Sequence, residues 1–194
     1  MMQSSVRRRV SLTLLTASLI LASVSALPHA HDQAAIELHY APEENLERID
    51  VALIEAAQHD IDLASYVLTD VAVIEALTRA AERGVIIRVY LYESQIYDHG
   101  RPFQALQDLR RTRGVTIKVK SHAEPLMHLK SYQIDGRLLR SGSANFSASG
   151  LKAQDNDMII INEKSVVDRF KKEFDRMWSR NNHLVYKDVY PTFR

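Results

Sequence analysis

The amino-acid sequence predicts an α/β fold in which a mixed, mainly parallel sheet is sandwiched between helices. In the first half of the chain, strand-like apolar segments alternate with segments that have the apolar repeat of an amphipathic helix, an order typical of parallel strands joined by helices. In the second half, Asp135-Gly136 separates two apolar segments and is a strong signal for a two-residue hairpin. Antiparallel strands are therefore expected to join the same sheet.

The first predicted strand and helix lie near the start of the predicted domain. Ile36, Leu38 and Tyr40 alternate with polar residues, which predicts a strand. A helix is expected to open at Pro42, because apolar residues then recur at three- and four-residue spacing. These apolar residues are Leu46, Ile49, Leu53, Ile54 and Ala57. The next strand is predicted over residues 61–67.

Two further helix and strand pairs follow in order. Asp70 is expected to cap a helix that ends at Arg83-Gly84, where glycine accepts the left-handed conformation. Residues 85–91 are apolar almost throughout, which suits a central strand covered on both faces. A third helix is predicted over about 102–113, and an alternating strand over 115–120.

The hairpin and a last helix complete the predicted fold. Its two strands are predicted over 127–134 and 137–141, and a further strand over 158–161. Residues 165–180 have the pattern of an amphipathic helix. Its inward residues are predicted to be Val166, Phe170, Phe174, Met177 and Trp178. The tail from Asn181 has no periodicity and is not assigned.

Residues 1–26 have the pattern of a secretory signal peptide. Three arginines at 7–9 precede an apolar run over 10–24 and the small-residue sequence Val24-Ser25-Ala26, so cleavage is expected after Ala26. The alternative is an uncleaved anchor, although the run is shorter than the roughly 20 apolar residues that span a membrane. We expect a single domain over 27–194, with a periplasmic or secreted location and no integral membrane segment after cleavage.

Composition narrows the function classes. The chain has no cysteine, which excludes disulfides and thiolate metal sites. The full chain has 25 Lys+Arg and 24 Asp+Glu; removal of three arginines leaves 22 against 24, so the formal charge changes from +1 to −2. This balance argues against binding nucleic acid through overall positive charge. A local basic cluster could either follow a polyanion or be a solvated face. It consists of Arg110, Arg111, Arg113, Lys118 and Lys120.

Chemically useful side chains are spaced regularly across the predicted hairpin. His128-Leu129-Lys130 is followed after four residues by Asp135, and after six more by Gly142-Ser143-Ala144-Asn145. Residues two apart on a strand share a face, so His128 and Lys130 are expected to point the same way. The hairpin then returns the chain, which brings the second cluster into their neighbourhood.

These side chains suit a phosphodiester. Lys130 offers positive charge to the non-bridging oxygens, while Ser143 and Asn145 offer hydrogen-bond donors where negative charge develops. The neutral imidazole of His128 can attack phosphorus and form a phosphohistidine. Gly142 lets the backbone approach closely.

The geometry of the displacement predicts a homodimer. Attacking and leaving atoms lie roughly in line on opposite sides of phosphorus, so one imidazole cannot serve both. The chain holds one such pattern. We therefore expect His128 of the partner subunit to act as general acid and then as general base in a two-fold dimer.

The pattern HxK, four residues, D, six residues, GSxN resembles the signature of the phospholipase D superfamily. From Glu37 to about Trp178 the chain is similar to the small secreted endonuclease branch. The resemblance implies a phospholipase D-like αβα homodimer that cleaves nucleic acid, DNA or RNA, with little sequence preference and with no metal or other cofactor. It also implies that His128 is the nucleophile and that Lys130 and Asn145 bind phosphate.

The resemblance further implies an acidic residue that orients the histidine. By position this residue is Asp155, where the family usually has glutamate, and Asp157 is the alternative. Asp135 is interpreted as structural because it lies at the turn. Arg137 and Arg140 lie inside the motif and are expected to reach substrate.

The expected function is a metal-independent, non-specific endonuclease. Two alternatives stay open: a phospholipase D that acts on phospholipid headgroups, and a non-catalytic module that binds polyanions. Turnover of plasmid DNA against phospholipid vesicles would distinguish the two enzymes, and polyanion binding without turnover by the wild-type protein would indicate the binding module.

Overall fold

A computed structural model of the protein describes residues 35–95, 97–98, 101–102, 104–181 and 183–185. The predicted signal peptide, residues 1–26, lies outside the described residues, and so does most of the tail after Asn181. None of the helices in the described ranges combines the length and the apolar character that a membrane crossing requires.

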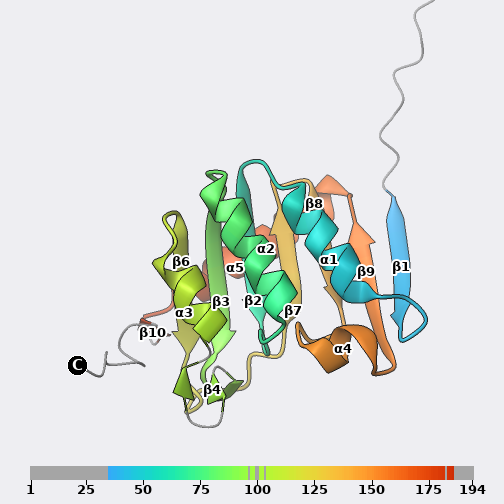
Figure 1. The fold of residues 1–194 in the computed structure, drawn as a ribbon. Coiled ribbons are helices and arrows are strands. Elements are labelled where there is room, and N and C mark those ends of the chain that lie inside the picture. Colours follow the sequence, from blue (N-terminus) through green and yellow to red (C-terminus); the bar gives the residue numbers. More distant parts are fainter. Residues whose placement is uncertain (1–34, 96, 99–100, 103, 182, 186–194) are drawn as a thin grey trace, which may run out of the picture. The chain divides into compact units, whose positions relative to one another are not determined.

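The main sheet has eight strands in the order β1-β9-β8-β7-β2-β3-β6-β10 (Figure 1). Their bounds are β1 Ile36–Ala41, β2 Asp60–Ser65, β3 Ile86–Tyr92, β6 Val115–Lys120, β7 Lys130–Ile134, β8 Leu138–Gly142, β9 Asn156–Ile161 and β10 His183–Val185. A separate two-stranded ribbon consists of β4 Tyr97–Asp98 and β5 Arg101–Pro102.

The sheet is mixed, as predicted, but the expectation that it is mainly parallel is wrong. Only β2 with β3 and β3 with β6 are parallel; β1 with β9, β9 with β8, β8 with β7, β7 with β2 and β6 with β10 are antiparallel. A strand-helix-strand unit gives parallel neighbours only where the helix returns the chain to the adjacent position. The chain from β1 to β2 does not do so, since β1 lies at the far edge beside β9.

Helices cover both faces of the sheet, which confirms the predicted sandwich (Figure 1). The helices are α1 Leu46–Glu55, α2 Val71–Glu82, α3 Gln104–Arg111, α4 Ala148–Lys152 and α5 Lys164–Trp178, with a 3₁₀ turn at Glu93–Gln95. α1, α2 and α3 lie side by side on one face, whereas α5 lies on the other, against β2, β7 and β8.

Side-chain caps decide where two of these helices begin. Asp70 caps α2 as predicted, because its carboxylate accepts a hydrogen bond from the Val73 N–H at 3.1 Å. α1 begins at Leu46 and not at Pro42, because Asn45 caps it by accepting from the Arg48 N–H at 3.1 Å. Residues 42–44 form a turn instead.

The apolar core lies mainly between the sheet and α1 to α3, and a smaller cluster lies beneath α5. The first strand does not contribute its predicted apolar face to the core. Ile36, Leu38 and Tyr40 are 66%, 50% and 52% exposed, and β1 is an edge strand of the sheet. Alternation therefore predicted the strand but not the burial of its apolar face.

Candidate active site

His128 and Lys130 lie at the end of the sheet where β2 and β8 finish and β7 begins. Lys130 is the first residue of β7 and pairs with Ser65, the last residue of β2. The Tyr66 N–H donates to the Leu129 carbonyl at 2.8 Å and so extends this pairing by one step. β7 thus begins three residues later than predicted, and His128 lies on the segment that leads into it.

Gly142 ends β8 at the same end of the sheet, and the backbone conformation at this position requires a glycine. Its φ of 137° lies in a region that other residues rarely adopt, and a Cβ would lie 2.4 Å from the Asp157 carbonyl oxygen. The close approach that Gly142 permits is therefore to β9. This contact places the 143–145 segment beside the start of β9.

Lys130 is a buried cation whose ammonium has no carboxylate partner within the described residues. Only 6% of the residue is exposed, and its Nζ donates to the His128 carbonyl at 2.9 Å. Burial, and secondly the charge of Arg140, lower the pKa of this ammonium. A buried positive charge without a counter-ion favours an incoming anion, because the anion replaces the hydration that burial removes.

The side chain of His128 is exposed, and its ring contacts an aromatic residue that the sequence analysis did not assign to the site. The Tyr66 ring lies 4.7 Å from the His128 ring, centroid to centroid, at 57°. The same ring lies 5.2 Å from Lys130 Nζ, within the range of a cation–π contact. The position of Tyr66 at the end of a predicted strand, opposite the motif, was the available signal.

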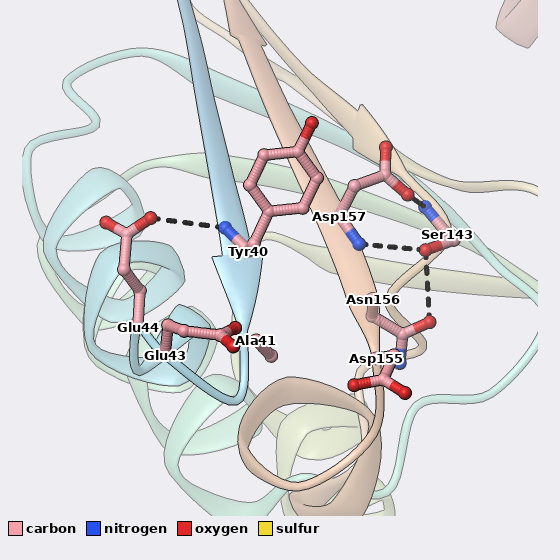
Figure 2. A pocket seen from close by; sticks show the side chains of 8 residues that line it. All are labelled: Tyr40, Ala41, Glu43, Glu44, Ser143, Asp155, Asn156 and Asp157. Carbon is pink, nitrogen blue, oxygen red and sulfur yellow. Dashed lines mark hydrogen bonds between the residues drawn. The ribbon is translucent and has the colours of Figure 1, made fainter.

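The Ser143 hydroxyl is not free to bind phosphate, because it already forms hydrogen bonds with residues of β9 (Figure 2). The hydroxyl donates to Asn156 Oδ1 at 3.0 Å and accepts from the Asp157 N–H at 2.9 Å. The Ser143 N–H donates to Asp157 Oδ1 at 3.0 Å. Hydrogen bonding to Ser143, first through its side chain and then through its backbone N–H, lowers the pKa of Asp157. Ser143 and Asp157 thus join the motif to β9.

Asn145 carries an unsatisfied polar atom next to this junction. Its side-chain oxygen is buried and has no hydrogen-bond partner among the described residues. The Asn145 carbonyl accepts from the Ser147 N–H at 2.8 Å, and Gly150 packs closely against it. The backbone of this loop is therefore held firmly, and the unpartnered side-chain atom is an acceptor, so only the amide nitrogen of Asn145 could donate to a phosphate oxygen.

Asp155 lies in a cavity of about 690 Å³ that includes neither His128 nor Lys130 (Figure 2). Its polar lining comprises Tyr40, Glu43, Glu44, Ser143, Asp155 and Asp157 together with Asn156. The structure shows no hydrogen bond from Asp155 or Asp157 to the His128 ring. Within one chain, therefore, neither Asp155 nor Asp157 makes the contact that was expected to orient His128.

Arg140 does not lie where it could contact substrate, which corrects the expectation from the sequence. Its side chain is 0% exposed and forms an ion pair with Asp50, which is equally buried. Proximity to the motif in sequence suggested an outward role. However, Arg140 pairs with Tyr132 across the hairpin and shares its inward face.

The expectation that Arg137 reaches substrate is also wrong, because Arg137 lies at the opposite end of the hairpin from Lys130. β7 and β8 are each five residues long, so the turn lies roughly 15 Å from the end of the hairpin that carries Lys130. Arg137 is 73% exposed and pairs with Asp135 at 3.2 Å. Asp135 is structural in its contacts: its carboxylate accepts from the N–H groups of residues 58, 59 and 60.

Part of the basic cluster is engaged in packing. Lys118 donates to the Trp178 carbonyl at 2.8 Å and lies over its ring, and Lys120 is only 7% exposed. Arg111 pairs with Asp108 at 3.4 Å. These contacts favour a structural role for the two lysines over a track for a polyanion.

Comparison with known proteins identifies relatives of this chain. Residues 51–178 match the family described as "Cardiolipin synthase, PLD-like domain". A mitochondrial cardiolipin hydrolase of Drosophila melanogaster is 34% identical over 148 residues, which cover 66% of this chain and 56% of that protein. A phospholipase D of Rickettsia conorii is 29% identical over 118 residues, covering 60% and 56%. The chain thus spans little more than half the length of these relatives.

A solved structure shares the fold. The crystal structure of Nuc, a phospholipase D family member from Salmonella typhimurium, superimposes with a TM-score of 0.71 at 21% identity. The match covers 79% of this chain and 99% of that one. The likeness supports the predicted phospholipase D-like architecture.

The comparisons contradict the expected periplasmic or secreted location, because several of the curated relatives are mitochondrial cardiolipin hydrolases. Residues 1–26 contain three arginines and several serines but no acidic residue. Secretory and mitochondrial targeting segments both contain basic residues, and mitochondrial ones are rich in arginine and serine and poor in acids. That shared composition is the reason that residues 1–26 suggested a secretory segment.

Proposed function

This chain belongs to the family described as "Cardiolipin synthase, PLD-like domain", and from that premise we propose that it is a phosphodiesterase that uses His128 as its nucleophile. The observation that carries the proposal is that an exposed imidazole, His128, and a buried ammonium, Lys130, both contact the Tyr66 ring, and that this ammonium lacks a carboxylate partner within the described residues. A phosphodiester brings the negative charge that this ammonium would accept.

The proposed reaction has two displacements. A ring nitrogen of His128 attacks phosphorus, the P–N bond forms, and the P–O bond to the leaving group breaks. The leaving oxygen takes a proton from His128 of the partner subunit. Water then attacks phosphorus, the P–N bond breaks, and the partner's His128 accepts a proton from that water. Neither step requires a metal or another cofactor.

The chain's own residues would divide the work of stabilising charge. Lys130 would bind a non-bridging oxygen, and the side-chain amide of Asn145 would donate to another. Tyr66 would hold the His128 ring, since their centroids are 4.7 Å apart. Ser143 would act indirectly, because its hydroxyl bonds Asn156 and Asp157.

Nucleic acid, DNA or RNA, is the first proposed substrate, by the resemblance of the motif to the endonuclease branch. Phospholipid is the second, and two observations favour it. The curated relatives include cardiolipin hydrolases and a phospholipase D. In addition, Leu126 and Leu129, which flank His128, are 55% and 36% exposed, so apolar surface adjoins the site.

The test compares both substrates with one matched pair of variants. Purified protein is incubated in EDTA with supercoiled plasmid or with cardiolipin vesicles, and cleavage is followed on gels and by released phospholipid products. We expect His128→Ala to lose about 10⁴-fold or more of wild-type turnover, because the nucleophile and the acid are both removed. The control is His122→Ala, since that exposed histidine pairs with Glu93 at 2.6 Å.

The outcomes separate the candidate functions. Cleavage of plasmid alone would support the endonuclease, and cleavage of vesicles alone the phospholipase. Polyanion binding without turnover of either substrate by the wild-type protein would instead support the non-catalytic module. Complete loss of activity in EDTA, restored by a divalent cation, would contradict the proposed mechanism.

A further inference from the structure

A buried ion pair lies directly behind the candidate site. Arg140 Nε donates to Asp50 Oδ1 at 2.9 Å, and Nη2 donates to Oδ2 at 3.0 Å, so the contact is bidentate. The Tyr132 hydroxyl also donates to Asp50 Oδ1, at 2.8 Å. Burial raises the pKa of Asp50, and the charge of Arg140 opposes that shift. The guanidinium is therefore held in one orientation.

The remaining donors of Arg140 point at the two halves of the motif. Nη1 donates to the Lys130 carbonyl at 2.8 Å and, more weakly, to the Ala144 carbonyl at 3.4 Å. The guanidinium carbon also lies 4.4 Å from the centroid of the Phe146 ring. One planar group thus contacts the residue that offers the ammonium and both neighbours of Asn145.

We propose that Arg140, held by Asp50, is a positioning residue that sets the spacing between Lys130 and Asn145 at the phosphate site. The proposal rests on the proposed phosphodiesterase function. Neither residue touches substrate, since both side chains are fully buried. The guanidinium acts through the backbone of β7 on one side and of the 144–146 loop on the other.

Chemistry favours positioning over stability as the reason for this pair. A buried ion pair is weak support for stability, because an apolar pair of similar volume is often as stable or more so. An apolar pair, however, could not donate hydrogen bonds to the Lys130 and Ala144 carbonyls as Arg140 does. Lysine is a poor substitute as well, because it lacks the planar fork that bonds a carboxylate and two carbonyls together.

The experiment uses variants of the full chain that keep the core filled. The double variant Asp50→Leu/Arg140→Met removes both charges at similar volume, and Arg140→Lys keeps the charge without the fork. The matched control is Asp62→Leu/Arg88→Met, which removes a partly buried ion pair of 2.6 Å beneath α5. The probe substrate is bis(p-nitrophenyl) phosphate, assayed at least 15 °C below the Tm of each variant.

We expect the Asp50→Leu/Arg140→Met variant to fold and to lose roughly 100-fold in kcat, because a displacement of about 1 Å at a reacting centre has that effect. Arg140→Lys should lose a similar factor. The control variant should keep kcat within about threefold, because its ion pair contacts β7 only through the Gln133 side chain and bonds neither Lys130 nor the 144–146 loop.

The pH profile gives a readout that a purely structural role would not change. Titratable and charged groups near Lys130 are Arg140, with Asp50 behind it, and the rings of Tyr66 and His128. The charge of Arg140 lowers the pKa of Lys130, so its removal should move the alkaline limb of kcat/KM to higher pH. Arg140→Lys, which keeps the charge, should leave that limb in place.

A folded Asp50→Leu/Arg140→Met variant with wild-type kcat would overturn this inference alone. An equal loss in the Asp62→Leu/Arg88→Met control would overturn it too, since the effect would then be general destabilisation. A wild-type protein that hydrolyses no phosphodiester would overturn both this inference and the proposed function. If the double variant fails to fold, Arg140→Lys decides: unchanged kcat in that folded variant contradicts the positioning role.

Discussion

Tyr66 is the side chain that links the His128 imidazole and the Lys130 ammonium of the candidate site. Its ring contacts the His128 ring, and Lys130 Nζ lies over it. The Tyr92 ring supports it from behind, with centroids 5.8 Å apart. Because no carboxylate among the described residues bonds the His128 ring, this aromatic contact is the visible restraint on the orientation of that ring.

We therefore predict that Tyr66→Leu lowers kcat about tenfold while Tyr66→Phe stays within about threefold of wild type. An aromatic pair and a cation–π contact each contribute about 1 kcal/mol, and 1.4 kcal/mol corresponds to a factor of ten. Hydrolysis of bis(p-nitrophenyl) phosphate measures both values. Equal rates for the Leu and Phe variants would show that the ring does not restrain His128.

Asp135 connects the β7–β8 hairpin to the start of β2, far from the candidate site. Burial alone would raise the pKa of Asp135, but hydrogen bonds from the N–H groups of His59, Asp60 and Gln58 outweigh it and lower the pKa. Asp135 has a φ of 55°, a conformation that Asn and Asp tolerate better than most residues. A single residue thus forms the turn and attaches it to the neighbouring strand.

At the level of this hairpin, we predict that Asp135→Ala lowers the free energy of unfolding by about 3 kcal/mol. The three backbone N–H groups would lose their acceptor, and alanine disfavours the positive φ. Asp135→Asn should lose about half as much, because it keeps one acceptor. Urea denaturation measures these differences. Loss of activity without loss of stability would mean that Asp135 serves the site and not the turn.

The same hairpin should show a pH dependence of defined sign. Since the folded-state pKa of Asp135 is lowered, its stabilisation relative to Asn is present above the unfolded-state pKa of about 4. It is lost as pH falls through the lower folded-state pKa. Urea midpoints of wild type and Asp135→Asn should therefore converge in acid, and a constant difference down to pH 2 would contradict this assignment.

For the molecule as a whole, one chain supplies one His128, whereas the proposed displacement needs two imidazoles. The nucleophile of one chain and the acid of its partner would form each site, so the proposed active species is a homodimer. The exposed position of His128, just before β7 begins, is compatible with such an arrangement.

We predict that mixing His128→Ala chains with Lys130→Ala chains, after unfolding and refolding together, does not restore full activity. Each mixed dimer would hold one His128 imidazole and one Lys130 ammonium, whereas the wild-type dimer holds two of each. Sedimentation establishes the mass of the wild-type protein, and the plasmid assay in EDTA measures turnover. Full activity from a strictly monomeric preparation would contradict the dimer and the two-histidine mechanism together.

Local sequence patterns were sufficient for the main elements and for the central motif, but not for α4, β4, β5 or β10. Apolar spacing located α2, β3 and the β7–β8 hairpin, because burial of one side of a strand or helix imposes its own period. His128 and Lys130 could be identified because their chemistry and spacing are contained in one short segment. Asp135 could be assigned to the turn because a two-residue hairpin has strong local preferences.

Contacts between distant residues decided what local patterns could not. Arg140 is buried because Asp50 lies 90 residues earlier in the chain on α1, and no local signal marks that pairing. β1 lies antiparallel beside β9, so the sheet is mainly antiparallel and Ile36 is exposed. Ser143 is engaged because β9 presents Asn156 and Asp157 to it. Tertiary packing alone determines such neighbours, since each depends on where a remote segment docks.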